Sequence, residues 1–304
     1  MMELNLAQRL RNLTRSRNLI IGVPWFWLAL FFVLPFLFVL KISLSEPQLM
    51  QPPYQDWIRE MEDGLVSITI NFGNYLMLFE DDLYRDALWG SFKIASISTL
   101  LCILIGYPMA YAISLASKHL RVPLLMLIIL PFWTSFLLRV YAWIGILKDN
   151  GLLNQVLMSL GIIGEPLQIL HTNTAVYVGV VYTYLPFFIL PLYATLIRLD
   201  NTLLEAAADL GARPFKQFWS ITLPQSIPGI VAGSMLVFLP VMGEFVIPDL
   251  LGGPDTLMIG KLMWTEFFSN KDWPLASSLA AVLLVVLIIP FVVLRHYEQK
   301  VEGM

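Results

Sequence analysis

The chain contains little cysteine and little charge. One of its 304 residues is a cysteine, Cys102, and 13% are Asp, Glu, Lys or Arg, against about 25% in a typical soluble protein. A single cysteine forms no intrachain disulfide, so a small fold held together by disulfides is excluded. The 19 basic residues are outnumbered by 22 acidic ones, and the net charge of -3 provides no basic surface for nucleic acid.

Motifs for catalysis and metal binding are also missing from the sequence. The histidines His119, His171 and His296 are too far apart for a zinc motif such as His-Glu-x-x-His. There is no Gly-x-Ser-x-Gly segment and no Gly-x-x-x-x-Gly-Lys-Ser/Thr loop, so hydrolysis of an ester or of ATP has none of its usual motifs. We therefore expect a chain that is not an enzyme and has no metal or cofactor of its own.

Apolar residues are abundant, at 58% of the chain, against about 45 to 50% in soluble proteins. A helix that crosses the hydrocarbon of a membrane needs about 20 mostly apolar residues, because it must pair its own backbone polar groups. We predict an all-α membrane protein with six spanning helices, at residues 19–40, 94–117, 122–147, 172–197, 227–247 and 274–294.

The orientation follows from short-loop Lys and Arg residues, which tend to stay in the cytoplasm. They gather in an arm at residues 1–18, in the loops after the second and fourth spans, and in a tail at residues 295–304. They are Arg9, Arg11, Arg15, Arg17, Lys118, Arg121, Arg198, Arg213, Lys216, Arg295 and Lys300. Both termini and the loop at residues 198–226 are therefore predicted to be cytoplasmic. The first span is too long for a cleaved signal peptide, so we interpret it as a retained anchor.

The segment at residues 41–93 is acidic and is predicted to face outward. Its Trp and Tyr residues suit either a solvated loop with an interfacial aromatic belt or a packed outer subdomain. Its carboxylates, including Asp81 and Asp82, either attract a cation or a basic partner or simply form a solvated face.

The loop at residues 198–226 is predicted to form two short helices. Thr202 and Glu205 have the spacing of a capping box at the start of the first helix, and Gly211 is placed to end it in the left-handed conformation. Pro214 suits the first turn of the second helix. An apolar face on that helix comes from Phe215, Phe218 and Trp219, and its end is expected at Leu223 and Pro224. An exposed helix-turn-helix of this kind is suited to docking into a groove of another protein.

At these residues the chain resembles the permease subunits of binding-protein-dependent ABC importers. The signature of that family is Glu-Ala-Ala, three residues, Gly, nine residues and Ile-x-Leu-Pro. It is matched here by Glu205, Ala206, Ala207, Gly211, Ile221, Leu223 and Pro224. Residues 131–143 and 243–253 also resemble the first permease of spermidine/putrescine importers, with the putrescine type the more similar.

The resemblance implies a type I ABC importer permease fold, with residues 94–294 as the permease core, in a bacterial inner membrane. It implies four kinds of partner: a second homologous permease, two copies of a cytoplasmic ATPase that uses ATP and Mg, an extracytoplasmic polyamine-binding protein, and the polyamine itself. In this family the Glu-Ala-Ala helix couples the permease to the ATPase by seating in a cleft on it. The coupling residues implied here are Glu205, Ala206, Ala207, Asp209, Gly211, Arg213 and Phe215.

A polyamine path needs carboxylates and aromatic faces for its ammonium groups. Glu244 is the one acidic residue well inside a predicted span, and such residues usually face a bundle interior or an aqueous path. A structural alternative pairs Glu244 with Arg139 or Lys93. The candidate path residues are Glu244, Asp249, Trp133, Tyr141, Trp143 and Tyr184, although the aromatic ones also suit interfacial packing.

Two other functional classes stay open from the sequence. An ion-coupled secondary transporter of small cations would work without an ATPase, and it would be expected to show coupling carboxylates or broken helices in repeated halves. A channel or a purely structural membrane subunit is a third reading. The loop at residues 198–226, which we call the Glu-Ala-Ala loop, favours a cytoplasmic partner and transport by alternating access.

Overall fold

The computed structural model describes residues 17–60 and 66–302 of the chain. Residues 1–16 of the predicted basic arm, which include Arg9, Arg11 and Arg15, therefore lie outside the described residues. Helices dominate, as predicted, and a short antiparallel hairpin adds the strands β1 (Ile58–Glu60) and β2 (Val66–Ile68). The chain divides into two compact units, residues 1–78 with 266–282, and residues 79–265 with 283–304.

The first described element of the first unit is a long apolar helix. It consists of α2 (Arg17–Leu28), a π-helical turn (Ala29–Val33) and α3 (Leu34–Ser43). Most of its apolar side chains between Ile21 and Phe38 are exposed, as expected of a helix that lipid or another subunit surrounds.

The outer segment that follows is packed rather than a simple solvated loop. Asn74, in α4 (Gly73–Glu80), is buried and donates hydrogen bonds to the carbonyl oxygens of Ser43 and Ser45, both at 3.0 Å. The Ser43 hydroxyl lies 2.7 Å from the Tyr75 hydroxyl. These bonds tie the end of α3 to α4, because buried polar groups need partners.

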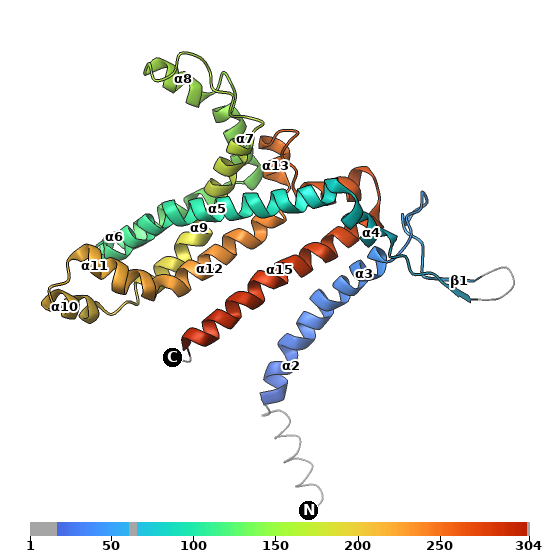
Figure 1. Ribbon diagram of the computed structural model, residues 1–304, viewed down its shortest axis with the longest axis horizontal. Coiled ribbons are helices and arrows are strands. Elements are labelled where there is room, and N and C mark those ends of the chain that lie inside the picture. The colour runs from blue at the N-terminus through green and yellow to red at the C-terminus, as the bar shows by residue number, and fades with distance from the viewer. Residues whose placement is uncertain (1–16, 61–65, 303–304) are drawn as a thin grey trace, which may run out of the picture. The chain divides into compact units, whose positions relative to one another are not determined.

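In the second unit, the helices α5 (Asp82–Leu115), α9 (Asn173–Leu196) and α12 (Leu223–Met242) pack side by side (Figure 1). Phe188 of α9 is fully buried, and it fits against Gly106 of α5 and Gly233 of α12. A Cβ atom added at Gly106 would lie 2.6 Å from the Phe188 ring, and one at Gly233 would lie 2.7 Å from the Phe188 carbonyl oxygen. Small residues at such crossings let helix backbones approach closely in a membrane.

The remaining elements of this unit are shorter. They are α6 (Lys118–Ile129) with a 3-10 turn (Leu130–Trp133), α7 (Phe136–Leu147), α8 (Leu152–Ser159), α10 (Asn201–Asp209), α11 (Pro214–Gln217) with a π-helical turn (Phe218–Thr222), α13 (Val246–Leu251) and α14 (Ile259–Trp264). A second π-helical turn (Thr265–Ser269) leads toward α15 (Trp273–Glu302), and both of these elements run across the boundary between the units.

Four helices in the described part of the chain are long and apolar enough to cross a membrane, at Ile21–Ser43, Asp82–Leu115, Asn173–Leu196 and Pro214–Met242. A fifth crossing results if the bent pair Lys118–Trp133 and Phe136–Ser159 counts as one span. The sixth predicted span lies within α15, whose described apolar part, Trp273–Ile289, is shorter.

The predicted third span, residues 122–147, is wrong as a continuous helix. It breaks at Thr134 and Ser135, where the two halves meet at 91°. Pro131 stands just before the break, and its missing N–H and its ring interrupt the helical hydrogen bonds. The hydroxyl and the N–H of Thr134 both donate to the Pro131 carbonyl oxygen, at 2.8 and 3.3 Å, where the 3-10 turn ends.

Two other predicted boundaries also move. The second span begins inside α5, which starts at Asp82 because the Asp81 carboxylate accepts the Leu83 N–H at 2.8 Å and caps the helix. The fifth span, predicted at residues 227–247, ends at Met242. Glu244 therefore lies at a helix break and not within a span.

Gly260 provides a test of the packing at that break. A Cβ atom at this position would lie 2.3 Å from the Gly243 carbonyl oxygen and 2.6 Å from that of Glu244. We expect Gly260→Ala to destabilise the purified protein by about 1 to 3 kcal/mol, as overpacking usually does. The measurement is the thermal unfolding midpoint in detergent.

Gly145→Ala is the matched control, because Gly145 lies in α7 with no atom within 4 Å of an added Cβ. Removal of a helical glycine should stabilise the protein by about 0.5 to 1 kcal/mol. Equal unfolding midpoints for the two variants would contradict the packing described here.

Candidate functional site

The first helix of the Glu-Ala-Ala loop, α10, is capped by Asp200. The Asp200 carboxylate accepts the Thr202 N–H at 2.9 Å, and this bond lowers the pKa of the Asp200 carboxyl. The predicted capping box of Thr202 and Glu205 is therefore wrong, because the helix starts at Asn201 and Thr202 is already inside it. The Glu205 side chain is left exposed.

The helix ends at Gly211 as predicted. Gly211 has a φ of +80°, and its N–H donates to the Ala208 carbonyl oxygen at 2.8 Å, while the Ala212 N–H donates to that of Ala207 at 2.9 Å. This pair of bonds is the Schellman motif, in which the left-handed residue is usually glycine.

The second helix of the loop starts at Pro214, as predicted, but does not end at Leu223 and Pro224. It passes through the π-helical turn Phe218–Thr222 into α12. The helix from Pro214 to Met242 is thus long enough to span a membrane. A force applied to the loop therefore acts directly on a spanning helix.

The predicted apolar face of this helix is divided between two environments. Phe218 packs edge-on against Tyr107 and Tyr111 of α5, with ring centroids 5.7 and 5.6 Å apart. Phe215 and Trp219 are exposed, and Phe215 retains 75% of its accessible surface. The inner ring thus holds the loop on α5, and the outer rings are available to a partner.

The predicted coupling residues lie together on this exposed part of the loop. Ala207 is partly buried, and the others are exposed: Glu205, Ala206, Asp209, Gly211, Arg213 and Phe215. Sequence reasoning missed Leu210, which is 89% exposed and the most exposed apolar side chain of the loop. Its position directly before Gly211 was the available signal, because a large apolar residue beside a sharp helix end has little protein to pack against.

Glu244 lies in the break between α12 and α13 and is 8% exposed. One carboxylate oxygen, Oε2, accepts the Tyr184 hydroxyl at 2.5 Å. The other, Oε1, accepts the N–H groups of Phe245 at 3.2 Å and Val246 at 3.0 Å. The carboxylate therefore satisfies amides at the start of α13 and links them to α9.

The predicted alternative pairing of Glu244 with Arg139 or Lys93 is wrong. Within the described residues, the Glu244 carboxylate bonds to Tyr184 and backbone amides and forms no ion pair. The Arg139 guanidinium instead lies over the rings of Phe132 and Phe136, 4.9 and 5.8 Å from their centroids.

Aromatic rings connect these two positions. The Phe132 ring packs edge-on against that of Phe187, with centroids 5.2 Å apart, and Phe187 lies 6.1 Å from Tyr184. The series runs from Arg139, beside the break of the third predicted span, to Glu244 at the break between α12 and α13.

The structure places the other predicted path residues in different surroundings. Trp143 packs edge-on against Tyr182 of α9, with centroids 5.3 Å apart. Trp133 and Tyr141 are exposed, and neither is among the hydrogen-bond partners of Glu244. Asp249 forms an ion pair with Lys261, whose Nζ lies 3.3 Å from Oδ1.

Sequence reasoning missed Lys261 and the aromatic pair beside it. The rings of Phe245 and Trp264 are stacked, with centroids 4.4 Å apart and planes at 11°. These partners are distant along the chain, and no local periodicity links them. Only the pairing of α13 with α14 brings them together.

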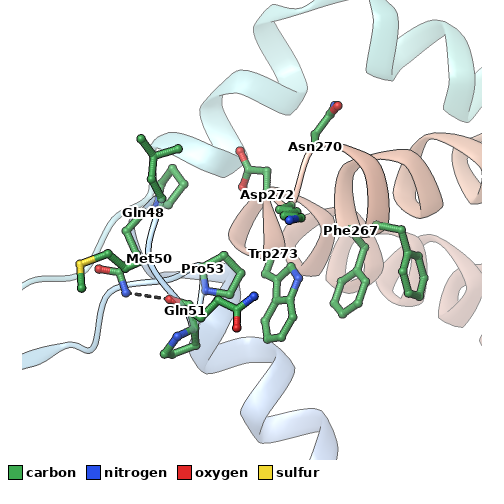
Figure 2. A pocket seen from close by; sticks show the side chains of 13 residues that line it. Gln48, Met50, Gln51, Pro53, Phe267, Asn270, Asp272 and Trp273 are labelled. Atoms are coloured by element: carbon green, nitrogen blue, oxygen red, sulfur yellow. Dashed lines mark hydrogen bonds between the residues drawn. The ribbon is translucent and has the colours of Figure 1, made fainter.

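The first unit contains a groove of about 1000 Å³. It lies between the loop at residues 47–53 and the segment at residues 267–273, and Figure 2 shows Trp273 between Pro53 and Phe267. The Phe267 and Trp273 rings are stacked, with centroids 4.9 Å apart and planes at 4°. Gln48 supports the loop by donating to the carbonyl oxygens of Pro52 and Tyr54.

No group of three or more His, Cys, Asp or Glu residues that could hold a metal ion occurs in residues 17–60 and 66–302. In the segment at residues 41–93, both Asp81 and Asp82 already have partners within the chain. Asp81 caps α5, and Asp82 pairs with Arg85.

Comparisons with known proteins agree with this geometry. Residues 102–303 match the family described as binding-protein-dependent transport system inner membrane component. The chain is 39% identical, over 90% of its length and 91% of the relative's, to the spermidine/putrescine transport system permease protein PotB of Haemophilus influenzae. It is 38% identical to the PotB protein of Escherichia coli, over 86% of this chain and 90% of that one.

A solved structure shares the fold at low sequence identity. A chain of the bacterial alginate ABC transporter, in complex with alginate pentasaccharide-bound periplasmic protein, superposes with a TM-score of 0.70 at 16% identity. The match covers 96% of each chain.

The Glu244 contacts lead to a stability prediction. Glu244→Ala should destabilise the purified protein by about 1 to 3 kcal/mol, because the Tyr184 hydroxyl and the amides of α13 lose their acceptor. Glu244→Gln should cost less, since it keeps one carbonyl oxygen. Thermal unfolding in detergent measures both, and a Glu244→Ala protein as stable as the wild type would show that these bonds do not hold the break.

Proposed function

Because the chain belongs to the family of binding-protein-dependent transport system inner membrane components, we propose that it lines the path of an ATP-driven polyamine importer. As a permease subunit it carries no catalytic site, and the ATPase is a separate subunit. The observation that carries the proposal is the exposed Glu-Ala-Ala loop, which is continuous with the spanning helix α12. The polyamine is inferred from the 39% identity to a spermidine/putrescine permease.

In this proposal the chain crosses a bacterial inner membrane six times, with both termini in the cytoplasm. The four long apolar helices, the bent pair at residues 118–159 and the apolar part of α15 supply the crossings. The basic residues of the short loops favour this orientation, because Lys and Arg in such loops tend to stay in the cytoplasm.

We propose that α10 seats in a cleft of one ATPase subunit and that a second, homologous permease presents its own loop to the other. Small side chains at Ala206 and Gly211 let the helix backbone approach the partner closely. The exposed rings and Leu210 supply the apolar area that docking buries. ATP and Mg are bound by the ATPase subunits.

The path is proposed to use Glu244, Asp249, Trp143 and Tyr184. Carboxylates attract ammonium groups, and aromatic faces stabilise them further. Glu244 retains one lone pair, on Oε2, for a cation, because Oε1 already accepts backbone N–H groups and Oε2 accepts the Tyr184 hydroxyl. Trp133 and Tyr141 join the path only where the second permease covers them, because both are exposed on this chain.

Transport would proceed by alternating access. ATP binding brings the two loops together, opens the outer side to a docked binding protein, and the substrate leaves inward after hydrolysis. Two conformations separated by a few kcal/mol are sufficient, because only differential partner binding shifts their populations.

The polyamine-binding protein is proposed to dock on the outer segment of the first unit. The groove at residues 47–53 and 267–273 offers a preformed aromatic surface there. We favour this groove over Asp81 and Asp82, because both of these carboxylates already have partners within the chain.

The alternative function, an ion-coupled secondary transporter, has no support. The family match and the solved structure that shares the fold both belong to ABC importers. Co-purification of a nucleotide-hydrolysing subunit with this chain separates the two classes directly.

Gly211 provides a test of the coupling loop. Gly211→Val places a β-branched residue at a positive φ, where a left-handed residue costs about 1 to 2 kcal/mol, so the end of α10 should change. We expect ATP-dependent uptake to fall about tenfold, the factor that corresponds to about 1.4 kcal/mol. Membrane abundance, measured by immunoblot, should stay normal.

Gly211→Asn is the matched control, because asparagine adopts the left-handed conformation more readily. It should retain most of the uptake. Normal uptake by the valine variant would remove the coupling role assigned to this helix end.

The substrate is tested by uptake of labelled putrescine, with unlabelled spermidine as competitor. The cells lack this chain and other polyamine importers, and they are complemented with the wild-type gene. Uptake that returns with the wild-type chain supports a polyamine permease. Uptake that is unaffected by the chain would leave the family assignment intact and overturn the polyamine assignment.

A further inference from the structure

The helices α13 and α14 are joined by an aromatic and an ionic contact. Phe245 and Asp249 are four residues apart, and the Asp249 N–H donates to the Phe245 carbonyl oxygen at 3.0 Å, so their side chains lie on one face. Lys261 and Trp264 are three residues apart on α14. Phe245 stacks on Trp264 and Asp249 pairs with Lys261, and we call these four residues the ammonium cluster.

The ammonium cluster is open to its surroundings. The side chain of Asp249 is 58% exposed and that of Lys261 is 34% exposed, and Trp264 is also exposed. Glu244, on the same stretch of chain, is buried and already bonded to Tyr184. A dissolved cation therefore reaches the Asp249 carboxylate more readily than the Glu244 carboxylate.

The backbone beneath the ammonium cluster is tightly held. Gly260 abuts the carbonyl oxygens of Gly243 and Glu244, and the Ile259 N–H donates to the Ser91 hydroxyl oxygen at 2.9 Å. The start of α14 is thus anchored to α5 and to the break after α12. Separation of the Lys261 ammonium from Asp249 would therefore require rotation of the lysine side chain and no movement of the helix.

The chemistry of the lysine side chain matches that of the proposed substrate. A lysine side chain carries a primary ammonium on a flexible four-carbon stem. An aliphatic diamine likewise carries a primary ammonium at each end of its methylene chain. A carboxylate beside aromatic rings is the environment that recognises such a group. In this structure Asp249 already pairs with a primary ammonium, that of Lys261 from the same chain.

We propose that Lys261 is an internal competitor for the substrate ammonium at Asp249, and so sets the affinity of this point of the path. The inference rests on the proposed polyamine transport. A substrate ammonium pairs with Asp249 only after the Lys261 ammonium rotates away, and the lysine returns when the substrate leaves. Exposed ion pairs are weak, so the competition should lower substrate affinity by about two- to fivefold, enough to favour release without preventing entry.

The test uses the complete importer, purified in detergent without ATP and without the binding protein. Equilibrium binding of labelled putrescine to this complex is measured for wild type, Lys261→Met and Asp249→Asn. We expect Lys261→Met to bind putrescine about two- to fivefold more tightly, because methionine keeps an unbranched side chain but has no ammonium. Asp249→Asn should bind more weakly, and Lys261→Met should then bring no gain in the Asp249→Asn background.

Lys148→Met is the control for removal of a positive charge, since Lys148 is exposed and forms no ion pair within the described residues. It should bind as the wild type does. Lys261→Arg keeps a cation at the position and should not gain affinity, which provides a readout if Lys261→Met does not fold.

Unchanged or weaker binding by a folded Lys261→Met complex would overturn the proposal, and so would a gain by Lys261→Arg. A parallel measurement of ATP-dependent putrescine uptake by the complete wild-type importer separates this failure from a failure of the proposed function. If the wild type transports putrescine and Lys261→Met gains no affinity, the proposed role of Lys261 is wrong and the proposed transport function is unaffected.

Discussion

The constraint on which this structure depends is that a chain in a membrane must satisfy its own backbone polar groups wherever a helix stops. The break after α12 shows how this is done. Gly243 ends one helix, and the Glu244 carboxylate accepts amides at the start of the next while taking the Tyr184 hydroxyl. Glu244, which the sequence suggests is an isolated charge within a span, thus serves as a structural hydrogen-bond acceptor. Any role of Glu244 in transport is additional to this structural role.

The same break organises the packing of α13 and α14 in the second unit. Because Gly260 lies directly on the carbonyl oxygens of Gly243 and Glu244, α14 is held close to α13, and this closeness creates both the stacked rings and the ion pair. A carboxylate, two aromatic rings and an ammonium therefore gather where the backbone is closely packed. Rigid support is what a site needs if it is to discriminate among cations.

At the other end of α12, the Glu-Ala-Ala loop is part of a spanning helix. The π-helical turn at Phe218–Thr222 carries the helix through Pro224 without a stop. The Phe218 ring is held between Tyr107 and Tyr111 of α5. A partner that moves the loop would therefore move two packed helices together, which suits a permease that responds to a separate ATPase.

The sequence by itself determined the membrane class, most of the apolar helices, the family and the left-handed end of α10 at Gly211. These depend on composition, on local spacing and on the conformational freedom of one residue, which are all properties of neighbours along the chain. The bond from Tyr184 to Glu244, the stacking of Phe245 on Trp264 and the pairing of Asp249 with Lys261 were decided by the tertiary structure alone. Each depends on which distant groups packing brings within bonding distance, and no local pattern encodes that.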